Sequence, residues 1–155
     1  MNKEKIINEK SKLIDWVHSL EDISDDLWFK PFREGAWGTA EVISHFISWD
    51  KFVMENRLNY LLKDEAFPIV SVDINEINLE AAKYARSGIS KLELVQEFIT
   101  IRKELISLLV QLPAARFEQP FPGKESISLS DYFVGLIEHD VKHMEEINAH
   151  IRKFL

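Results

Sequence analysis

The sequence contains no cysteine. This absence excludes disulfide bonds, thiolate metal ligands and a cysteine nucleophile. If thiol chemistry occurs on this protein, the sulfur must therefore come from a small molecule. The sequence also lacks any stretch that approaches the roughly 18 uncharged residues of a membrane-spanning helix. Because its first residues, MNKEK, run directly into an amphipathic segment, we expect a cytoplasmic protein that does not insert into membranes.

Basic residues are in the minority and form no run. Lys and Arg total 19 against 26 Asp and Glu, which gives a formal net charge of −7. Binding to DNA or RNA depends largely on basic side chains that neutralise the phosphate backbone. We therefore expect that nucleic acid is not a partner of this protein.

Strand-like alternation, internal repeats and low-complexity tracts are missing as well. What the chain has instead is a 46% apolar composition, with the apolar residues recurring at helical spacing. A chain of 155 residues buries one core well and two cores poorly. Residues 1–155 are therefore predicted to form a single domain.

The apolar periodicity predicts four long amphipathic helices and one shorter helix. The long helices are expected at residues 3–20, 39–62, 90–112 and 130–155, and the shorter helix at residues 73–87. Thr39, Ser90 and Ser130 are the expected N-caps of the later long helices. The prolines and the glycine of residues 113–128 predict a loop, with one turn around residues 114–117. The fold class is thus all-α, a four-helix bundle, with a long crossover between the second and third helices because residues 63–90 are too many for a hairpin turn.

Three histidines stand out on two of these helices. His139 and His143 are four residues apart, so both imidazoles project from the same side of the last helix. If His45 on the second helix faces them, three nitrogen ligands could hold a divalent metal, Zn or Ni, and leave coordination positions open for catalysis. All three lie on the shoulders of their apolar stripes, where amphipathic side chains are also commonly half exposed without any role. We assign no function to the other two histidines, His18 and His150.

Two carboxylates near these histidines have alternative interpretations. Asp140 lies close to the centre of an apolar stripe, so it needs a partner, either a backbone cap, a Trp indole or a ligand imidazole that it orients. Glu41 precedes His45 by one helical turn, where it is either a further ligand or general base, or a first-turn carboxylate that favours the helix dipole. No catalytic residue is assigned.

Aromatic side chains accompany the histidines on the same helices. They are core or interface residues first and walls of a substrate pocket second. The residues predicted to bind substrate are Trp37, Trp49, Phe52 and Tyr132. Trp16 and Ile14 lie outside the main apolar stripe of the first helix, which suggests either a homodimer interface or ordinary surface.

Two motifs resemble signatures of the DinB/YfiT-like superfamily. Residues 35–50, GAWGTAEVISHFISWD, resemble its second-helix signature of a Trp, a helix-start hydroxyl and then one His. Residues 139–143, HDVKH, are similar to the H-x-x-x-H of its fourth helix. Residues 73–78, DINEIN, and the ending 147–155 resemble the branch that includes DfsB and ClbS proteins.

The resemblance implies a four-helix bundle with a crossover, often dimeric, that binds a divalent metal through His45, His139 and His143. Members of the superfamily include thiol S-transferases, a thiol-dependent isomerase and a colibactin-resistance hydrolase. The sequence departs from many thiol-using relatives after the last ligand, where it has Met144-Glu145-Glu146 in place of Arg, Gly or Gln.

The leading hypothesis is a metal-dependent enzyme that acts on a small-molecule substrate in detoxification or stress response. Its metal would activate a low-molecular-weight thiol for transfer to an electrophile, or activate water for hydrolysis. One alternative is a non-catalytic bundle that binds a hydrophobic ligand or a protein, with vestigial histidines. Another is a purely structural metal, which three ligands do not saturate.

Overall fold

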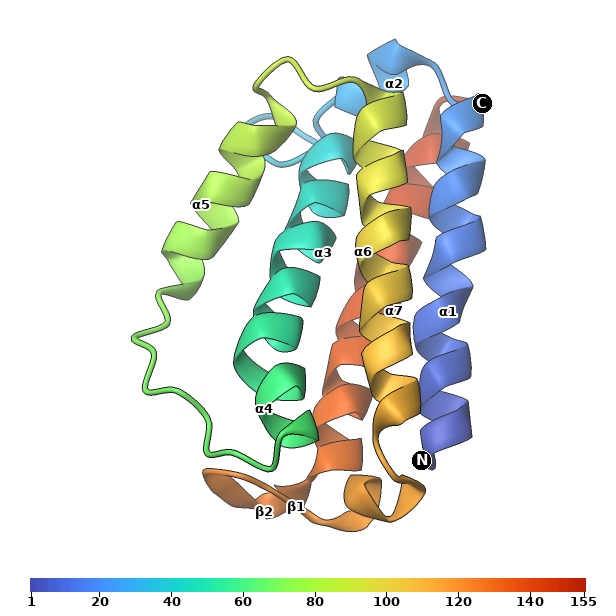
Figure 1. The fold of residues 1–155 in the computed structure, drawn as a ribbon. Coiled ribbons are helices and arrows are strands. Elements are labelled where there is room, and N and C mark those ends of the chain that lie inside the picture. Colours follow the sequence, from blue (N-terminus) through green and yellow to red (C-terminus); the bar gives the residue numbers. More distant parts are fainter.

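Four long helices run along a common axis in this computed structural model, which describes all 155 residues (Figure 1). They are α1 (Lys3–Ser19), α3 (Thr39–Val53), α6 (Lys91–Gln111) and α7 (Leu129–Lys153). α1 and α3 each pack against both α6 and α7. The predicted all-α four-helix bundle is therefore confirmed.

The predicted crossover joins α3 to α6. The chain leaves α4 (Asn59–Leu62) at one end of the bundle and returns through α5 (Ile74–Ala85) to the other end (Figure 1). α3 and α6 consequently run in the same direction. α5 packs along the outer side of α3, so the crossover adds a fifth helix beside the bundle.

Short elements complete the fold. They are α2 (Asp25–Phe29), 3₁₀ turns at Leu20–Asp22 and Ala114–Glu118, and the antiparallel strands β1 (Pro120–Phe121) and β2 (Lys124–Ser128). The turn expected around residues 114–117 is thus present, whereas the short hairpin that follows it was not predicted. A hairpin this short turns at Gly123, whose φ is +86°, and its strands are too brief for alternation to be visible in the sequence.

Two helix caps differ from the sequence prediction. α7 begins two residues earlier, because the Ser128 hydroxyl accepts from the backbone N–H of Asp131 and the Asp131 carboxylate accepts from the N–H of Ser128, each at 3.0 Å. Ser130 instead donates to the carbonyl of Met1. At α3 the cap is Gly38 rather than Thr39. The backbone of Gly38 lies so close to the carbonyl of Lys30 that a Cβ atom would stand 2.5 Å from that oxygen, so only glycine fits there.

The predicted second helix, residues 39–62, is continuous but not uniform. Met54–Leu58 form a π-helical segment between α3 and α4. In this segment the side-chain amide of Asn56 donates to the carbonyl of Phe52 at 3.3 Å. Periodicity alone does not reveal a single wide turn.

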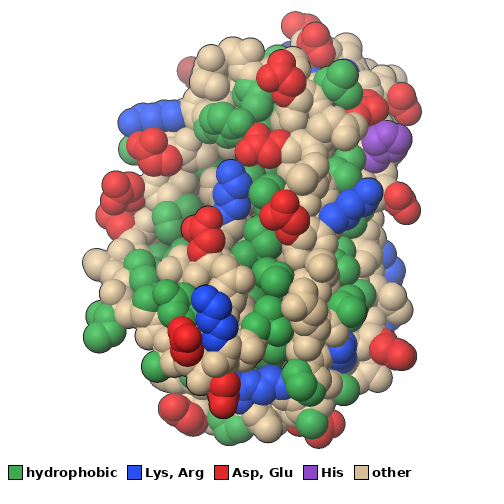
Figure 2. Space-filling view, in the orientation of Figure 1, with side chains coloured by type: hydrophobic (Ala, Val, Ile, Leu, Met, Phe, Trp, Pro, Cys, Tyr) green, Lys and Arg blue, Asp and Glu red, His purple; other side chains and the backbone are tan.

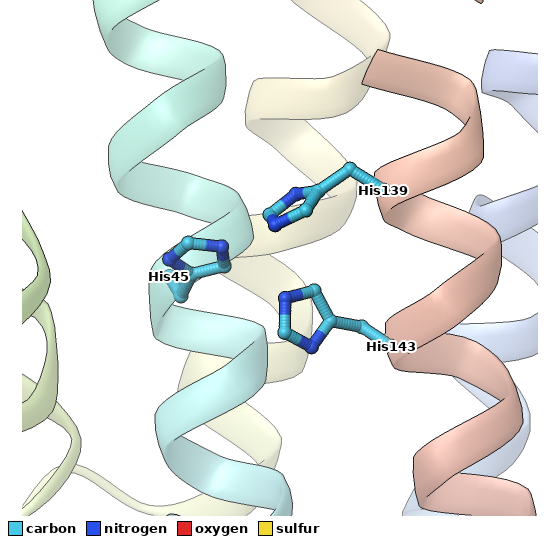
Figure 3. Close-up of side chains that lie close together, drawn as sticks. All are labelled: His45, His139 and His143. Atoms are coloured by element: carbon cyan, nitrogen blue, oxygen red, sulfur yellow. The ribbon is translucent and has the colours of Figure 1, made fainter. Parts of the chain in front are cut away.

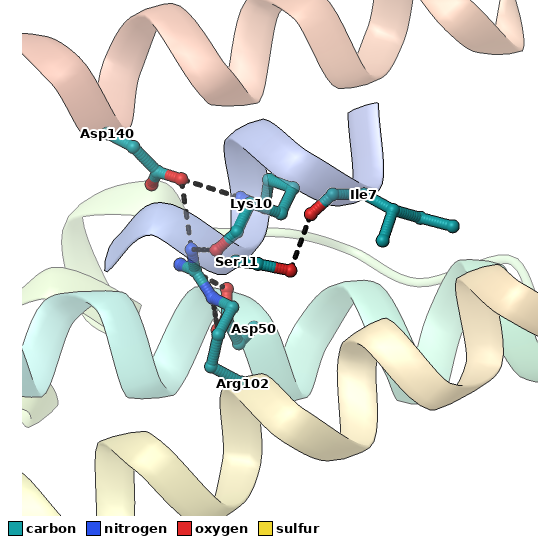
Figure 4. A network of polar contacts seen from close by, with 6 residues as sticks. All are labelled: Ile7, Lys10, Ser11, Asp50, Arg102 and Asp140. Atoms are coloured by element: carbon teal, nitrogen blue, oxygen red, sulfur yellow. Dashed lines mark hydrogen bonds and ion pairs between the residues drawn. The ribbon is translucent and has the colours of Figure 1, made fainter. Parts of the chain in front are cut away.

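A layer of four buried charges crosses the middle of the bundle, one from each long helix (Figure 4). It consists of Lys10, Asp50, Arg102 and Asp140. The Arg102 guanidinium binds both oxygens of Asp50, at 2.6 and 3.2 Å, and one oxygen of Asp140 at 3.2 Å. The Lys10 ammonium donates to the same Asp140 oxygen at 2.8 Å. We name these residues the charged layer; apolar clusters fill the bundle on both sides of it.

Trp16, which the sequence placed at an interface or on ordinary surface, makes contacts within its own chain. The indole N–H of Trp16 donates to the side-chain oxygen of Asn148 at 2.9 Å and its ring packs on the apolar core, so Trp16 serves the fold of its own chain. No helix combines the length and the apolar character that crossing a membrane requires.

Candidate metal centre

The three predicted histidines meet between α3 and α7. One potential ligand atom from each of His45, His139 and His143 lies within 4.8 Å of the other two. The ring centroids are 4.6 to 5.3 Å apart, and Figure 3 shows the rings turned toward one another from the two helices. Imidazole nitrogen is a common ligand of zinc, nickel and other first-row divalent metals. This arrangement follows from the spacing on α7 and from the packing of α3 against it.

His45 is buried, and its side chain contacts a residue of α5. Its Nδ1 lies 3.0 Å from the side-chain oxygen of Asn78, and the indole N–H of Trp49 donates to the same oxygen, also at 3.0 Å. The Nε2 atom of His45 is buried and has no hydrogen-bond partner. An unpartnered buried nitrogen costs free energy, whereas a bound cation would satisfy it. The residues present therefore fit a metal.

The two histidines of α7 open the cluster to solvent. His139 is exposed and His143 is half-buried. The Nδ1 atom of His143 lies 3.7 Å from a carboxylate oxygen of Glu146, which is beyond hydrogen-bond distance, and the two form an ion pair only when the imidazole is protonated. A small molecule can therefore reach the cluster from the side of His139.

Comparison with known proteins assigns the chain to a family. Residues 15–147 match the family model of the DinB superfamily. The chain belongs to the DinB superfamily. A search of the curated proteins found no sequence that matches it.

Two solved structures share the fold of this DinB-superfamily chain. One is YfiT from Bacillus subtilis, described as "a probable metal-dependent hydrolase with an unusual four-helix bundle topology". It aligns with a TM-score of 0.75 and 18% identity over 98% of this chain and 87% of its own. The other is the colibactin self-resistance protein ClbS in complex with a double-stranded DNA, with a TM-score of 0.68 and 19% identity over 97% of this chain and 92% of its own.

The ClbS complex overturns the expectation about nucleic acid. The exclusion of nucleic acid was wrong, because a protein of this fold is seen with double-stranded DNA. It rested on a net charge of −7 and on the absence of a basic run in the sequence. Net charge sums the whole surface, whereas a docking surface depends on which side chains the fold brings together. On the face in Figure 2, acidic and basic side chains are in fact interspersed.

All three histidines of this DinB-superfamily site favour the neutral form. Burial, and then the nearby imidazoles of His143 and His139, lower the pKa of His45 to about 4. Partial desolvation also lowers the pKa of His139, although the residue as a whole is exposed, and burial together with His139 lowers the pKa of His143. Neutral imidazole is the form that coordinates metal, so the site is ready for a cation at neutral pH.

The depressed pKa of His45 predicts a pH-dependent stability of the metal-free protein. Its folded pKa of about 4 lies below the usual value of 6.5, so between these values the unfolded chain binds a proton that the folded chain does not. The stability contribution is complete above about pH 6.5 and is lost as the pH falls toward 4. At 1.36 kcal/mol per pKa unit, the loss amounts to about 3 kcal/mol. Urea unfolding of metal-free protein at pH 7, 6, 5 and 4 measures it.

A His45→Gln variant is the control for this pH dependence, because glutamine does not titrate. We expect a clearly shallower decline between pH 6.5 and 4 than in the wild type. The remaining slope comes from other groups with a lowered pKa, among them His139, His143 and His150. An equal slope in both proteins would show that His45 is not held neutral.

A cavity of about 360 Å³ adjoins the cluster and runs between α3, α5 and α7. His45 and His139 lie at one end, and the charged layer contributes Lys10, Asp50 and Asp140 to its lining. The rest of the lining is mainly apolar: Phe46, Trp49, Val53, Ile74, Gly135 and Leu136, beside the polar Asn78. A substrate in this cavity would lie between imidazoles and buried charges.

The four aromatic residues predicted to bind substrate are placed differently from one another. Trp49 lines the cavity. The ring of Trp37 lies 5.4 Å from that of His45, outside the cavity lining. Phe52 packs behind Trp49 at 5.4 Å, and Tyr132 stacks on Phe121 at 4.4 Å. Burial raises the pKa of the Tyr132 phenol above its usual range.

The two carboxylates discussed above are both paired. Asp140 has the partner that its burial required, but the partner is the cation pair of Lys10 and Arg102 rather than an indole or a backbone cap. Although burial alone would raise it, these two cations lower the pKa of Asp140 below its usual range. Glu41 accepts from Arg86 at 2.6 Å, so it is occupied as an ion-pair partner.

Sequence reasoning missed Asn78 and Lys10. Asn78 lay in a segment noted only for family resemblance, and no pattern in the sequence shows that α5 folds back onto α3. Lys10 stands on the buried stripe of α1, four residues after Ile6 and three before Leu13. A lysine within an apolar stripe is a signal that could have been used, because an unpaired ammonium is rarely buried.

Proposed function

We propose that this protein is a metal-dependent enzyme in which His45, His139 and His143 hold a divalent cation, zinc or nickel. The observation that carries the proposal is the convergence of three neutral imidazoles within 4.8 Å at the end of a cavity. Three protein ligands leave at least one coordination position open. When bound there, such a cation lowers the pKa of a coordinated water or thiol and provides a nucleophile at neutral pH.

The residues around the cluster favour a small electrophilic substrate with an apolar body and a hydrogen-bond-accepting group. Trp49, Val53 and Leu136 offer apolar surface to the body. The buried ammonium of Lys10 lines the cavity and has three N–H bonds, one of which is donated to Asp140. A further N–H can therefore donate to an oxygen of the substrate and stabilise negative charge on it.

Two reactions are consistent with this site. The description of YfiT as a "probable metal-dependent hydrolase" favours hydrolysis. Transfer of a low-molecular-weight thiol is the second candidate, and because the chain has no cysteine that thiol would be a cosubstrate. Either reaction would remove reactive electrophiles from the cell, so we propose a role in detoxification or stress response.

Metal binding tests the proposal directly. We expect untagged protein, loaded with Zn²⁺ or Ni²⁺ and desalted, to retain one metal ion per chain. With free metal at about 100 times its dissociation constant, stabilisation by about 2.7 kcal/mol should raise the melting temperature by about 5–10 °C. Chelator should reverse that shift. A melting temperature that neither metal nor chelator changes would remove the metal site and leave a non-catalytic bundle.

A further inference from the structure

The crossover helix α5 contacts α3 through a row of polar contacts beside the metal centre. The Ser44 hydroxyl donates to the carbonyl of Ala81 at 2.7 Å. Asn78 lies one turn before Ala81 on α5. Its side-chain oxygen contacts the His45 ring and accepts from the Trp49 indole. Ala81 is buried and small, which lets the two helices approach closely. α5 is therefore fixed against the turn of α3 that carries His45.

The hydrogen bonds of Asn78 determine which nitrogen of His45 carries a proton. An indole N–H only donates, so the Asn78 atom that faces Trp49 is the amide oxygen. The same oxygen is 3.0 Å from His45 Nδ1 and only accepts. Nδ1 therefore carries the hydrogen. In neutral imidazole the lone pair then lies on Nε2, the buried atom without a partner.

We propose that Asn78 is a positioning residue of the metal centre. It holds His45 in the tautomer with hydrogen on Nδ1 and fixes the ring so that Nε2 is presented to the cluster. Metal-binding histidines depend on such a partner on their other nitrogen, which fixes the tautomer and the ring orientation. The crossover helix is thus part of the site, although it supplies no ligand; this consequence for metal binding rests on the proposed function.

The role of Trp49 supports this assignment. By donating to the same oxygen it prevents the Asn78 amide from flipping, because a flipped amide would place an NH₂ group against an indole N–H. A flipped amide would also donate to His45 Nδ1 and move the ring hydrogen to Nε2, which blocks a ligand lone pair. Trp49 therefore acts on His45 through Asn78.

The test compares Asn78→Leu with Asn78→Asp in two measurements. The first is the ¹⁵N NMR spectrum of His45 in metal-free protein near pH 7, which reports the tautomer without any metal. We expect the Nδ1–H form in the wild type and in Asn78→Asp, which keeps an acceptor. Asn78→Leu removes the acceptor, so the Nε2–H form should become substantially populated.

The second measurement is the dissociation constant for Zn²⁺ by competition with a chromophoric chelator. Asn78→Leu should bind about 10 to 100 times more weakly than the wild type, whereas Asn78→Asp should bind as tightly or more tightly. Ser44→Ala is the matched control, because it removes a neighbouring hydrogen bond between α3 and α5 without touching His45. Its affinity should stay within about threefold of the wild type, inside the usual scatter of single contacts.

The outcomes separate this inference from the proposed function. If wild-type protein binds no metal, the proposed function fails, and the tautomer measurement alone decides the inference. If wild-type protein binds metal and Asn78→Leu has the wild-type tautomer and affinity, the inference fails while the function stands. Equal losses of affinity in Ser44→Ala and Asn78→Leu would overturn it as well, because they would trace the effect to the docking of α5.

Discussion

Replacement of Arg102 by methionine is expected to lower the free energy of unfolding by about 3–5 kcal/mol. Arg102 is fully buried and its guanidinium binds Asp50 with two parallel hydrogen bonds. Methionine of similar length leaves the Asp50 carboxylate buried without a cation, and it also removes one of the two cations that bind Asp140. Urea unfolding at pH 7, followed by circular dichroism, measures the loss.

Lys103→Met is the control for this prediction, since Lys103 is the next residue of α6 and is exposed. Its effect should stay within about 0.5 kcal/mol. The double variant Arg102→Met with Asp50→Leu removes one charge of each sign and leaves Lys10 paired with Asp140. It should therefore be more stable than Arg102→Met alone. A loss below 1 kcal/mol in Arg102→Met would contradict the prediction, because it would show that the ion pairs of Arg102 contribute little to stability.

Substitution of any one of His45, His139 and His143 by alanine is expected to weaken Zn²⁺ binding by about 100-fold or more. A zinc site with a binding free energy of 10–16 kcal/mol distributes several kcal/mol over each protein ligand, and every 1.4 kcal/mol corresponds to a tenfold change. The competition assay with a chromophoric chelator gives the dissociation constants. The metal-induced rise in melting temperature should shrink in parallel.

His18→Ala serves as the control because it removes a histidine that lies outside the cluster. Its affinity should equal that of the wild type, which shows that loss of any imidazole is not sufficient. Retention of full affinity by His143→Ala, in protein that is folded by circular dichroism, would mean that the metal is held elsewhere.

The helices and the pairing of His139 with His143 were accessible from the sequence because both depend on short-range geometry. The spacing of His139 and His143 places them on one side of a helix wherever that helix packs. His45 was within reach because its motif belongs to a signature shared with the superfamily. Caps were less accessible, since Ser128 and Ser130 both suit a helix start and only the reciprocal bond with Asp131 decides between them.

The partners of buried polar groups could not be predicted from the sequence. The sequence showed that Asp140 requires a partner, yet Lys10 and Arg102 are 130 and 38 residues away along the chain. The sequence likewise placed His45 on a helix but did not indicate that Asn78 would reach it from α5. Such pairs depend on how the helices pack, which no local pattern records.

The sequence by itself determined that the chain forms amphipathic helices, that they bundle around one apolar face each, and that two imidazoles share one side of the last helix. These properties follow from the period of the α-helix and from the burial of apolar surface. Only the tertiary structure decided that His45 meets the other two, that Asn78 sets its tautomer, and that a charged layer forms beside the cavity. Contacts between residues far apart in the chain form only when α5, α6 and α7 have packed against α3.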